Sequence, residues 1–309
     1  MTTCLDDSVL SATATCSTYA VMRYVLHYTN EEESAPARCG TDIHRALAAY
    51  FSGAGVEASM DILRNWYKPF ADENIPEGDR LCWSNVKNII EEYFETHPIE
   101  KLPFEIIKEG IETVVKAPLC EGIEFYALLD LPVREKATKA LYVCDHKTTG
   151  KVTSWWAKKF RLGSQLTGYT WAMGVQYNAV VTGAFVNAIE IGKLPNSKKK
   201  CRTHGVPYFE CSKQHTKFDL FVTGRSPEQI ISWKEDATIL AKRFQGLKQV
   251  YQDINMIQAV FQEGVFNNGC TFCEMKDFCA SGRQPELADA MLIRKIWSPW
   301  DLDTHLKFL

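Results

Sequence analysis

Two aspartates stand inside apolar, strand-like runs, and a lysine follows the second of them. Asp130 lies near the end of the run 125–131 (FYALLDL), and Asp145 lies in the run 141–147 (LYVCDHK), two residues before Lys147. A carboxylate buried in an apolar strand is costly unless a partner or a metal compensates it. Alternate residues of a strand share a face, so Asp145 and Lys147 point the same way, and Asp130 can join them if the strands pair.

This trio has the composition of a metal site for phosphate chemistry. Two carboxylates, a main-chain carbonyl and waters are the ligands that Mg²⁺ or Mn²⁺ prefers. Such an ion polarises a phosphoryl oxygen and lowers the pKa of bound water, and a neighbouring lysine positions that water or stabilises developing charge. The alternative is that Asp130 and Asp145 cap strand ends and Lys147 pairs with one of them. The D-x-K triplet alone favours this alternative, because such triplets are common by chance.

A second cluster of chemically active residues lies near the C-terminus. Cys270, Cys273 and Cys279 have the spacing C-x2-C-x5-C. A C-x2-C turn lets two thiolates converge on one metal, and a third can close on the same centre. Three ligands are one short of a Cys₄ zinc or iron-sulfur site, so the fourth must come from elsewhere in the chain. The alternative is a group of unrelated buried thiols.

The composition of the chain is that of a soluble globular protein. Of its 309 residues, 46% are hydrophobic and 24% are charged, which excludes a disordered or fibrous chain. No apolar run approaches the ~20 residues that span a bilayer, and the N-terminus lacks a basic segment followed by an apolar one. Eleven cysteines without an export signal indicate a reducing compartment. We therefore expect a cytoplasmic protein with no membrane partner.

Positive charge gathers in two places although the net charge is -3. Five basic residues lie between positions 147 and 161 with no acidic residue among them, and seven lie between 193 and 217 against Glu210 alone. A charge run is by default a solvated loop. The two patches gain a role if a site near them handles phosphate. Trp155 and Trp156 lie in the first patch and could stack unpaired bases, although adjacent tryptophans on a helix are more often at least half core.

Hydrophobic periodicity predicts an α/β fold with one mixed sheet. We expect helices over residues 9–28, from near Gly40, over 57–96 with a break around Pro76 and Gly78, and over 155–174. A capping box at Ser226 predicts the start of a further long helix. We expect strands over 104–108, 113–117, 123–133, 140–145, 179–189, 208–211 and 218–222.

The order of these motifs resembles that of the PD-(D/E)xK nucleases, specifically their RecB-like exonuclease branch. In that branch an acidic residue on one strand is followed by a D-x-K-T strand, here Asp145 to Thr148, and by a helix with Q-x-x-x-Y, here Gln165 and Tyr169. Gly40 and His44 likewise resemble the family's N-terminal G-x-x-x-H helix. The chain departs from the family at Ala127, where members often have glycine.

The resemblance implies a restriction-endonuclease-like core, with a central mixed sheet flanked by helices and a helical, cysteine-clipped periphery. We expect one nuclease domain over residues 1–309, with an N-terminal helical part (1–100), a catalytic sheet core (101–222), and C-terminal helices with the cysteine cluster (223–309). The resemblance also assigns roles. The metal ligands would be His44, Asp130, Asp145 and the carbonyl of His146. Lys147 would act on the attacking water, and Gln165 and Tyr169 would orient Lys147 or bind DNA phosphate.

The cysteine spacing is similar to that of iron-sulfur RecB-like nucleases, including CRISPR-associated ones and AddB-type helicase-nuclease subunits. In these proteins one upstream cysteine joins three downstream cysteines on a structural 4Fe-4S cluster. Cys16 would be the fourth ligand here, and Cys39 or Cys4 could substitute for it. Zinc is the alternative occupant.

Taken together, the motifs predict an Mg²⁺- or Mn²⁺-dependent DNA exonuclease, a hydrolase of phosphodiester bonds in recombination, repair or DNA-end processing. Its substrate would be DNA that is single-stranded or has free ends, in a bacterium or a phage-infected cell, with recombination or CRISPR-type protein partners. The alternatives are an endonuclease of the same superfamily and a non-catalytic scaffold that binds DNA ends. Polarity, strand preference and oligomeric state do not follow from the sequence.

Overall fold

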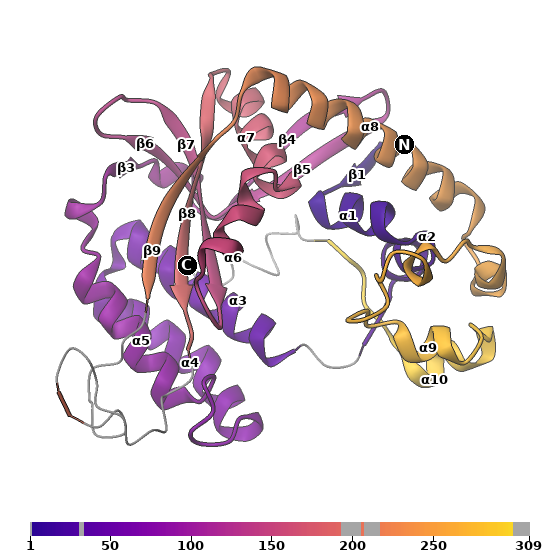
Figure 1. Cartoon of the computed structure of the whole chain (residues 1–309), viewed down its shortest axis with the longest axis horizontal. Helices are drawn as coiled ribbons and strands as arrows, with labels where there is room; N and C mark the ends of the chain where they lie inside the picture. The colour runs from indigo at the N-terminus through magenta and orange to yellow at the C-terminus, as the bar shows by residue number, and fades with distance from the viewer. Residues whose placement is uncertain (1, 31–33, 193–204, 207–216, 299–309) are drawn as a thin grey trace.

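The computed structural model describes residues 2–30, 34–192, 205, 206 and 217–298 (Figure 1). The strand expected at 208–211 lies outside these residues, as does the second basic patch except for Lys217. Within them the chain forms a mixed α/β fold, as predicted, with helices on both faces of a central sheet. None of the described helices is long and apolar enough to cross a membrane.

A five-stranded mixed sheet forms the centre of the molecule. Its strands, in spatial order, are β3 (Phe104–Ile106), β6 (Leu131–Glu135), β7 (Leu141–Thr149), β8 (Val181–Glu190) and β9 (Phe218–Gly224). β7 and β8 are parallel, and the other neighbours are antiparallel. Parallel neighbours need a crossover connection, which here includes α6 (Ser154–Lys158) and α7 (Ser164–Tyr177).

The prediction of one sheet is wrong, because the strand expected over 123–133 divides at Asp130. Its first half is β5 (Ile123–Leu129), which pairs with β1 (Thr3–Leu5) and β4 (Thr113–Cys120) in a separate three-stranded sheet. Its second half is β6, in the central sheet. A third, two-stranded sheet joins β2 (Tyr28–Thr29) to β10 (Ile293–Arg294). Asp130 is therefore the one residue between two sheets.

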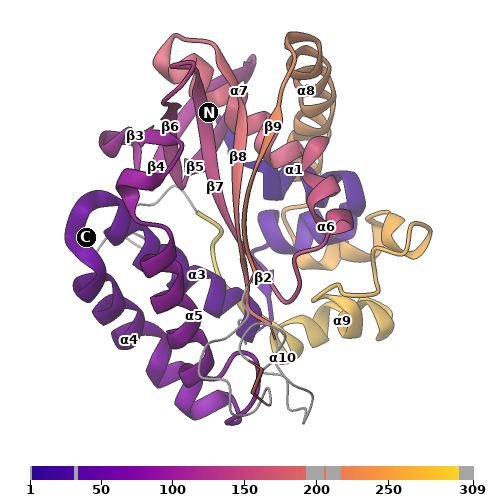
Figure 2. The same cartoon turned by 60° about the vertical axis from the view of Figure 1, so that its left-hand side comes forward.

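Alternation along β7 divides the hydrophobic core into two layers. Tyr142 and Cys144 face α3 (Ala35–Ala49), α4 (Gly55–Asn74) and α5 (Trp83–Thr96), which cover one face of the central sheet (Figures 1 and 2). Leu141 and Val143 face the opposite layer, formed by α1 (Asp7–Thr15), α7 and α8 (Pro227–Val250). The capping box predicted at Ser226 is confirmed at the start of α8.

The helix expected over 9–28 is interrupted at Cys16. α1 ends at Thr15, Cys16 is extended (φ -162°, ψ 118°), and α2 (Ser17–Ala20) continues into a π-helical turn over Val21–Val25. Glu263 stabilises this break, because its carboxylate accepts hydrogen bonds from the Ser17 amide (2.7 Å) and the Ser17 hydroxyl (2.9 Å). The break leaves Cys16 outside helical geometry and turned toward the C-terminal region.

The C-terminal region packs back onto the N-terminal segment. It consists of 3₁₀ turns over Ile254–Ala259 and Glu263–Val265, followed by the short helices α9 (Lys276–Ala280) and α10 (Ala288–Met291). Met275 and Phe278 share a third core cluster with Val21 and Met22. Figure 1 shows this yellow region beside the indigo helices α1 and α2.

Candidate active site

The junction between the two larger sheets brings together three potential metal ligands. His44 comes from α3, Asp130 lies between β5 and β6, and Glu112 directly precedes β4. The ligand atoms of these three residues all lie within 4.8 Å of one another. Within the described ranges, no other group of three or more histidine, cysteine, aspartate or glutamate side chains is this close. The residues thus form a compact nitrogen- and oxygen-rich group.

Glu112 is not among the residues that the sequence motifs predict for this site. Its amide donates a hydrogen bond to the Asp130 carbonyl (3.2 Å), so it continues the β4–β5 pairing by one residue. A bulge between Pro118 and Cys120 sets this register. Cys120 faces Ile123 at the turn, and beyond the bulge Thr113 faces Leu129. Without the bulge, Thr113 would face Asp130, and Glu112 would lie one position further away.

The environment of Glu112 fits a cation. Its Oε1 atom is buried and has no hydrogen-bond partner. Burial raises the pKa of this carboxyl to about 8, and the Asp130 charge adds to the effect. The Glu112 backbone is left-handed (φ 47°), a conformation that costs a non-glycine residue energy and is concentrated at functional sites. A divalent ion bound by its carboxylate would satisfy the unpartnered oxygen and offset the repulsion from Asp130.

Asp130 and His44 form an ion pair at the centre of the group. His44 Nδ1 lies 3.5 Å from Asp130 Oδ2, which also accepts a hydrogen bond from the His146 amide (2.7 Å). Burial alone would lower the pKa of His44, but the Asp130 charge outweighs it and raises that pKa to about 9. Burial would likewise raise the pKa of Asp130, and the His44 charge instead holds it below its usual range. The Asp130 carboxylate is therefore ionised at neutral pH.

A chain of polar contacts extends from Asp145 to α7. Lys147 Nζ lies 2.8 Å from Asp145 Oδ2 and donates a hydrogen bond to Gln165 Oε1 (3.1 Å). Gln165 Nε2 in turn donates to the Tyr169 hydroxyl (3.2 Å). Burial raises the pKa of Asp145, and the Lys147 charge opposes this shift. Burial would lower the pKa of Lys147, but Asp145 outweighs it and raises that pKa, so the ammonium group stays charged.

Asp145 is not one of the three clustered ligands, so the structure brings the expected residues together in a different grouping. Asp145 and Lys147 face α7, whereas His44 approaches from α3 on the other side of the sheet. Asp130 lies between the two sides, and its charge acts on both Asp145 and His44.

The side chain of His146 points into the core. The Asn187 amide nitrogen donates to His146 Nδ1 (2.8 Å), so that nitrogen acts as the acceptor and the proton lies on Nε2. The ring stacks on Phe51 with centroids 5.3 Å apart, and burial lowers its pKa to about 3. Because this imidazole is neutral and its Nδ1 atom already accepts a hydrogen bond, only the main chain of His146 can take part in the site. The contact seen there is the amide donating to Asp130.

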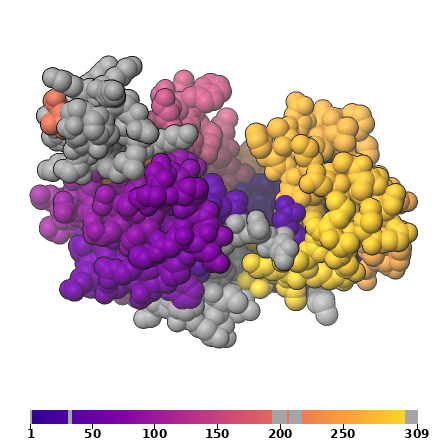
Figure 3. Space-filling model, turned by 90° about the horizontal axis from the view of Figure 1, so that it is seen from below, coloured from indigo at the N-terminus to yellow at the C-terminus, as the bar shows by residue number. Residues whose placement is uncertain are grey.

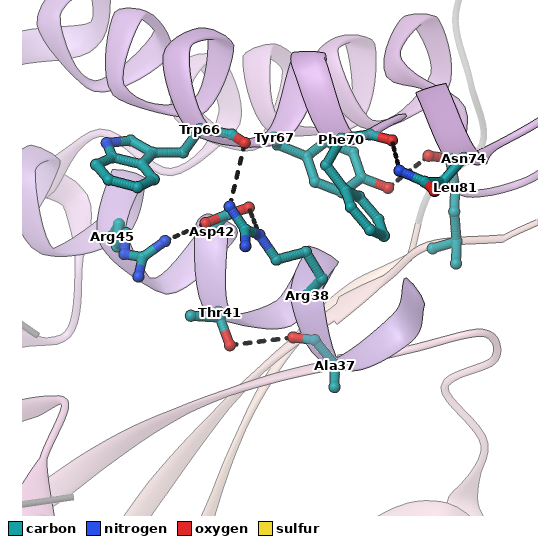
Figure 4. A network of polar contacts seen from close by, with 10 residues as sticks. All are labelled: Ala37, Arg38, Thr41, Asp42, Arg45, Trp66, Tyr67, Phe70, Asn74 and Leu81. Atoms are coloured by element: carbon teal, nitrogen blue, oxygen red, sulfur yellow. Dashed lines mark hydrogen bonds and ion pairs between the residues drawn. The ribbon is translucent and has the colours of Figure 1, made fainter. Parts of the chain in front are cut away.

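A buried ion-pair network fixes α3, the helix that carries His44 (Figure 4). Asp42 is fully buried and accepts a hydrogen bond from Arg38 Nε (2.7 Å) as well as one from Arg45. Arg45 also lies over the Trp66 ring of α4, 4.7 Å from its centroid. The network holds one face of α3 against α4, and the opposite face presents His44 to Asp130.

The cysteines expected at a second centre line one cavity of about 970 Å³, and they are Cys16, Cys270, Cys273 and Cys279. Gly264 lies between two of them, since a Cβ atom there would be 3.1 Å from Cys270 Sγ and 3.6 Å from Cys16 Sγ. Cys4 and Cys39, the alternatives to Cys16, lie elsewhere. The Cys4 thiol donates to the Tyr126 hydroxyl (3.4 Å), and Cys39 is a residue of α3 whose side chain is buried in the core.

The four sulfur atoms are spread around the cavity. No three of them lie within 4.8 Å of one another. In a tetrahedral zinc site with bonds of about 2.3 Å, neighbouring sulfurs would be ~3.8 Å apart. The arrangement is thus wider than a zinc tetrahedron.

Comparison with known proteins places this arrangement in a family. No curated protein matches the chain. Among solved structures, the chain is similar to a candidate exonuclease from Eubacterium rectale, with a TM-score of 0.48 and 12% sequence identity, over 96% of this chain and 91% of that one. The model of the PD-(D/E)XK nuclease superfamily matches residues 8–280, which include the carboxylates, Lys147 and the four cysteines that line the cavity. The chain therefore belongs to the PD-(D/E)XK nuclease superfamily.

Proposed function

We propose that this protein is an Mg²⁺- or Mn²⁺-dependent DNA exonuclease that processes DNA ends in recombination or repair. The observation that carries the proposal is the convergence of His44, Glu112 and Asp130 beside the Asp145–Lys147 pair. The exonuclease assignment is supported by the motif order, which resembles the RecB-like branch. The whole chain would act as one nuclease domain in the cytoplasm of a bacterium or a phage-infected cell, with protein partners from recombination or CRISPR-type systems.

In this proposal the ion is held by His44, Glu112 and Asp130, with Asp145 at the side facing α7. His44 would bind through a neutral nitrogen, so binding would release the proton that it shares with Asp130. A bound divalent ion would supply Lewis acidity, polarising a phosphoryl oxygen and lowering the pKa of a water ligand. The role of the buried carboxylates is to hold negative charge in a place where only a cation satisfies it.

Lys147 would provide positive charge at the scissile phosphate. Its ammonium group is aimed by two acceptors, Asp145 and Gln165, and the pKa shift described above keeps it protonated. It can therefore orient the attacking water and stabilise negative charge that develops on the phosphoryl oxygens. Gln165 acts as a positioning residue, since its own orientation is fixed by the Tyr169 hydroxyl.

We propose further that Cys16, Cys270, Cys273 and Cys279 hold a structural 4Fe-4S cluster. Support comes from the cavity that all four cysteines line and from their spacing, which resembles that of iron-sulfur RecB-like nucleases. The cluster would join the break between α1 and α2 to the C-terminal region, at a distance from the hydrolytic residues. Zinc is the alternative, and metal analysis with absorbance near 400 nm in anaerobically prepared protein separates the two.

The deciding experiment is a cleavage assay with Mg²⁺ or Mn²⁺. Linear DNA labelled at either end, in single- and double-stranded form, is compared with a covalently closed circle. We expect degradation of linear DNA only, reduced about 100- to 1,000-fold by Asp145→Asn and by Lys147→Ala, consistent with the loss of a major electrostatic contribution. Lys242→Ala, an exposed lysine on α8, is the control.

The other outcomes point to specific alternatives. Cutting of the closed circle would identify an endonuclease of the same superfamily. DNA binding without cleavage by any metal-loaded preparation would favour a scaffold that binds DNA ends.

A further inference from the structure

The segment 150–163 connects the two halves of the candidate active site. It follows β7, which carries Asp145 and Lys147, and precedes α7, which carries Gln165. It contains α6 and a 3₁₀ turn over Lys159–Arg161. In Figure 3 the pink atoms of this part of the chain border a hollow between the purple helical layer and the yellow C-terminal region.

The two adjacent tryptophans of this segment have different environments. Trp156 packs against the core, with its ring edge-on to Phe160 at a centroid distance of 4.9 Å. Trp155 is 81% exposed, and Leu162, seven residues later, is 83% exposed. Among the described residues Trp155 is the one exposed tryptophan, and an exposed indole offers a large flat apolar face to a ligand.

The exposed tryptophan stands on a well-anchored support. The Val152 amide donates to Glu190 Oε2 (2.6 Å), and the Thr153 side chain caps α6 by accepting from the Trp156 amide (3.0 Å). Phe160 is buried, and its carbonyl accepts a hydrogen bond from Arg225 Nη2 (2.7 Å). The backbone on both sides of Trp155 is thus held by buried contacts, which limits the entropy lost when a ligand stacks on the indole.

The charge around Trp155 is positive, and Lys159 Nζ lies over the Trp156 and Phe160 rings, 5.0 and 4.8 Å from their centroids. Lys151, Lys158, Lys159 and Arg161 are all exposed, and no ion pair to any of them occurs in the described part of the chain. Burial lowers the pKa of Lys159, and the charge of the nearby Lys147 lowers it further. Cations without carboxylate partners beside an exposed aromatic ring are complementary to a nucleic-acid strand, which offers phosphates and base faces together.

We propose that Trp155 is a stacking platform for an unpaired base of the DNA strand held at the metal site, and that the preferred substrate is therefore a single-stranded end. Lys158 and Lys159, three and four residues after Trp155, would contact the adjoining phosphates. A duplex hides the faces of its internal bases, so only an unpaired segment gives the indole a base to stack on. This proposal rests on the nuclease function proposed above and adds its substrate class.

The test combines binding and kinetics on Trp155→Leu and Trp155→Phe. Binding is measured without divalent cations, by the fluorescence of 2-aminopurine placed at successive positions of a single-stranded oligonucleotide. We expect the wild type and Trp155→Phe to quench one position strongly and Trp155→Leu to lose that quenching. With Mn²⁺, Trp155→Leu should raise KM for single strands about tenfold at nearly unchanged kcat, whereas Trp155→Phe should stay within about threefold of the wild type.

A charge variant separates stacking from attraction to phosphate. Lys158→Gln should weaken the binding of single strands and duplexes alike and reduce its salt dependence, with Lys242→Gln as the matched exposed lysine on α8. A Trp155→Leu effect equal on duplex and single strand would overturn the single-strand assignment. Unchanged KM and quenching in Trp155→Leu, with cleavage intact, would overturn the platform while the nuclease function stands. If the wild type quenches 2-aminopurine at one position but hydrolyses no DNA, base stacking on Trp155 would be supported and the nuclease function overturned.

Discussion

At the scale of single residues, the sequence revealed the carboxylates that interrupt apolar runs and missed the one outside such a run. Asp130 and Asp145 are conspicuous because each follows several buried hydrophobic residues. Glu112 precedes its strand, next to Ile111 and three residues after Glu109, and nothing in its sequence neighbours distinguishes it. The signal that could have found it is the two-residue turn Glu121–Gly122, which pairs β4 with β5. With that turn alone, Glu112 would be out of register with Asp130 by one residue. The bulge between Pro118 and Cys120 shifts the register so that the two residues lie opposite each other.

Replacement of Glu112 tests its place at the metal site. Glu112→Gln keeps the shape of the protonated side chain, which the raised pKa of about 8 makes the prevailing form at neutral pH without metal. We therefore expect little change in the melting temperature of metal-free protein. The affinity for Mn²⁺, measured by titration calorimetry, should fall about tenfold or more, because the amide cannot supply the negative charge. A large loss of metal-free stability with unchanged Mn²⁺ affinity would assign Glu112 a structural role instead.

At the scale of elements, periodicity located most helices and strands but not their breaks. The helical part over 57–96 divides at Asn74 and Trp83 around the expected Pro76 and Gly78. The breaks at Cys16 and Asp130 were not predicted. The run 9–28 contains no proline or glycine, and the run 123–133 contains only Pro132, which follows Asp130 by two residues and stands inside β6. Each break depends on distant residues, such as Glu263 beside Ser17 and the pairing of β5 and β6 in different sheets.

The position of α3 should depend on Asp42. Asp42→Ala would leave the Arg38 and Arg45 guanidinium groups without their buried carboxylate, and we expect the free energy of unfolding to fall by about 3–5 kcal/mol. Because α3 carries His44, the affinity for Mn²⁺ should also fall. Asp61→Ala, which removes the exposed pair with Arg64 on α4, should cost no more than about 1 kcal/mol in the same urea titration. Equal losses of unfolding free energy in the two variants would show that the Asp42 ion-pair network does not fix α3.

The start of α1 should give the protein a pH-dependent stability. Asp6 caps this helix by accepting from the Val9 amide (3.0 Å), and burial raises its pKa from 3.8 to about 6. The folded state thus holds the proton more tightly than the unfolded state. The resulting stability is fully present below pH ~4 and is lost as the pH rises through about 6.

Asp6→Asn keeps an N-cap acceptor and removes this titration. Relative to the wild type, the variant should gain stability between pH 4 and pH 7, by no more than about 3 kcal/mol. Urea unfolding of both proteins across this range measures the difference. A difference that stays constant with pH would show that Asp6 ionises as freely in the folded protein as in the unfolded chain.

At the scale of the whole molecule, the N-terminal segment around α2 packs against the C-terminal region over residues 254–294. Arg283 Nη1 donates to the Val260 carbonyl (2.6 Å), and the Tyr19 hydroxyl donates to Glu274 (3.0 Å), so the cysteine-bearing loop is held both to its own turns and to α2. The spacing of Cys270, Cys273 and Cys279 predicted a shared site. It could not select among Cys4, Cys16 and Cys39, because that choice depends on the break after α1.

The proposed cluster should stabilise the packing of the C-terminal region on the N-terminal segment. Cys16→Ser removes one of the four thiols that line the cavity, whereas Cys120→Ser changes a partly exposed thiol at the end of β4. Because a bound metal group contributes its binding free energy to the folded state, we expect Cys16→Ser to lower iron content, absorbance near 400 nm and melting temperature together. Cys120→Ser should retain all three. Limited proteolysis should then cut Cys16→Ser first between residues 254 and 292, since this region has few helical hydrogen bonds of its own and the loss of the cluster would remove part of what holds it against α1 and α2. Wild-type iron content in Cys16→Ser would exclude it as a ligand, and an unchanged melting temperature after loss of iron would exclude a structural role for the cluster.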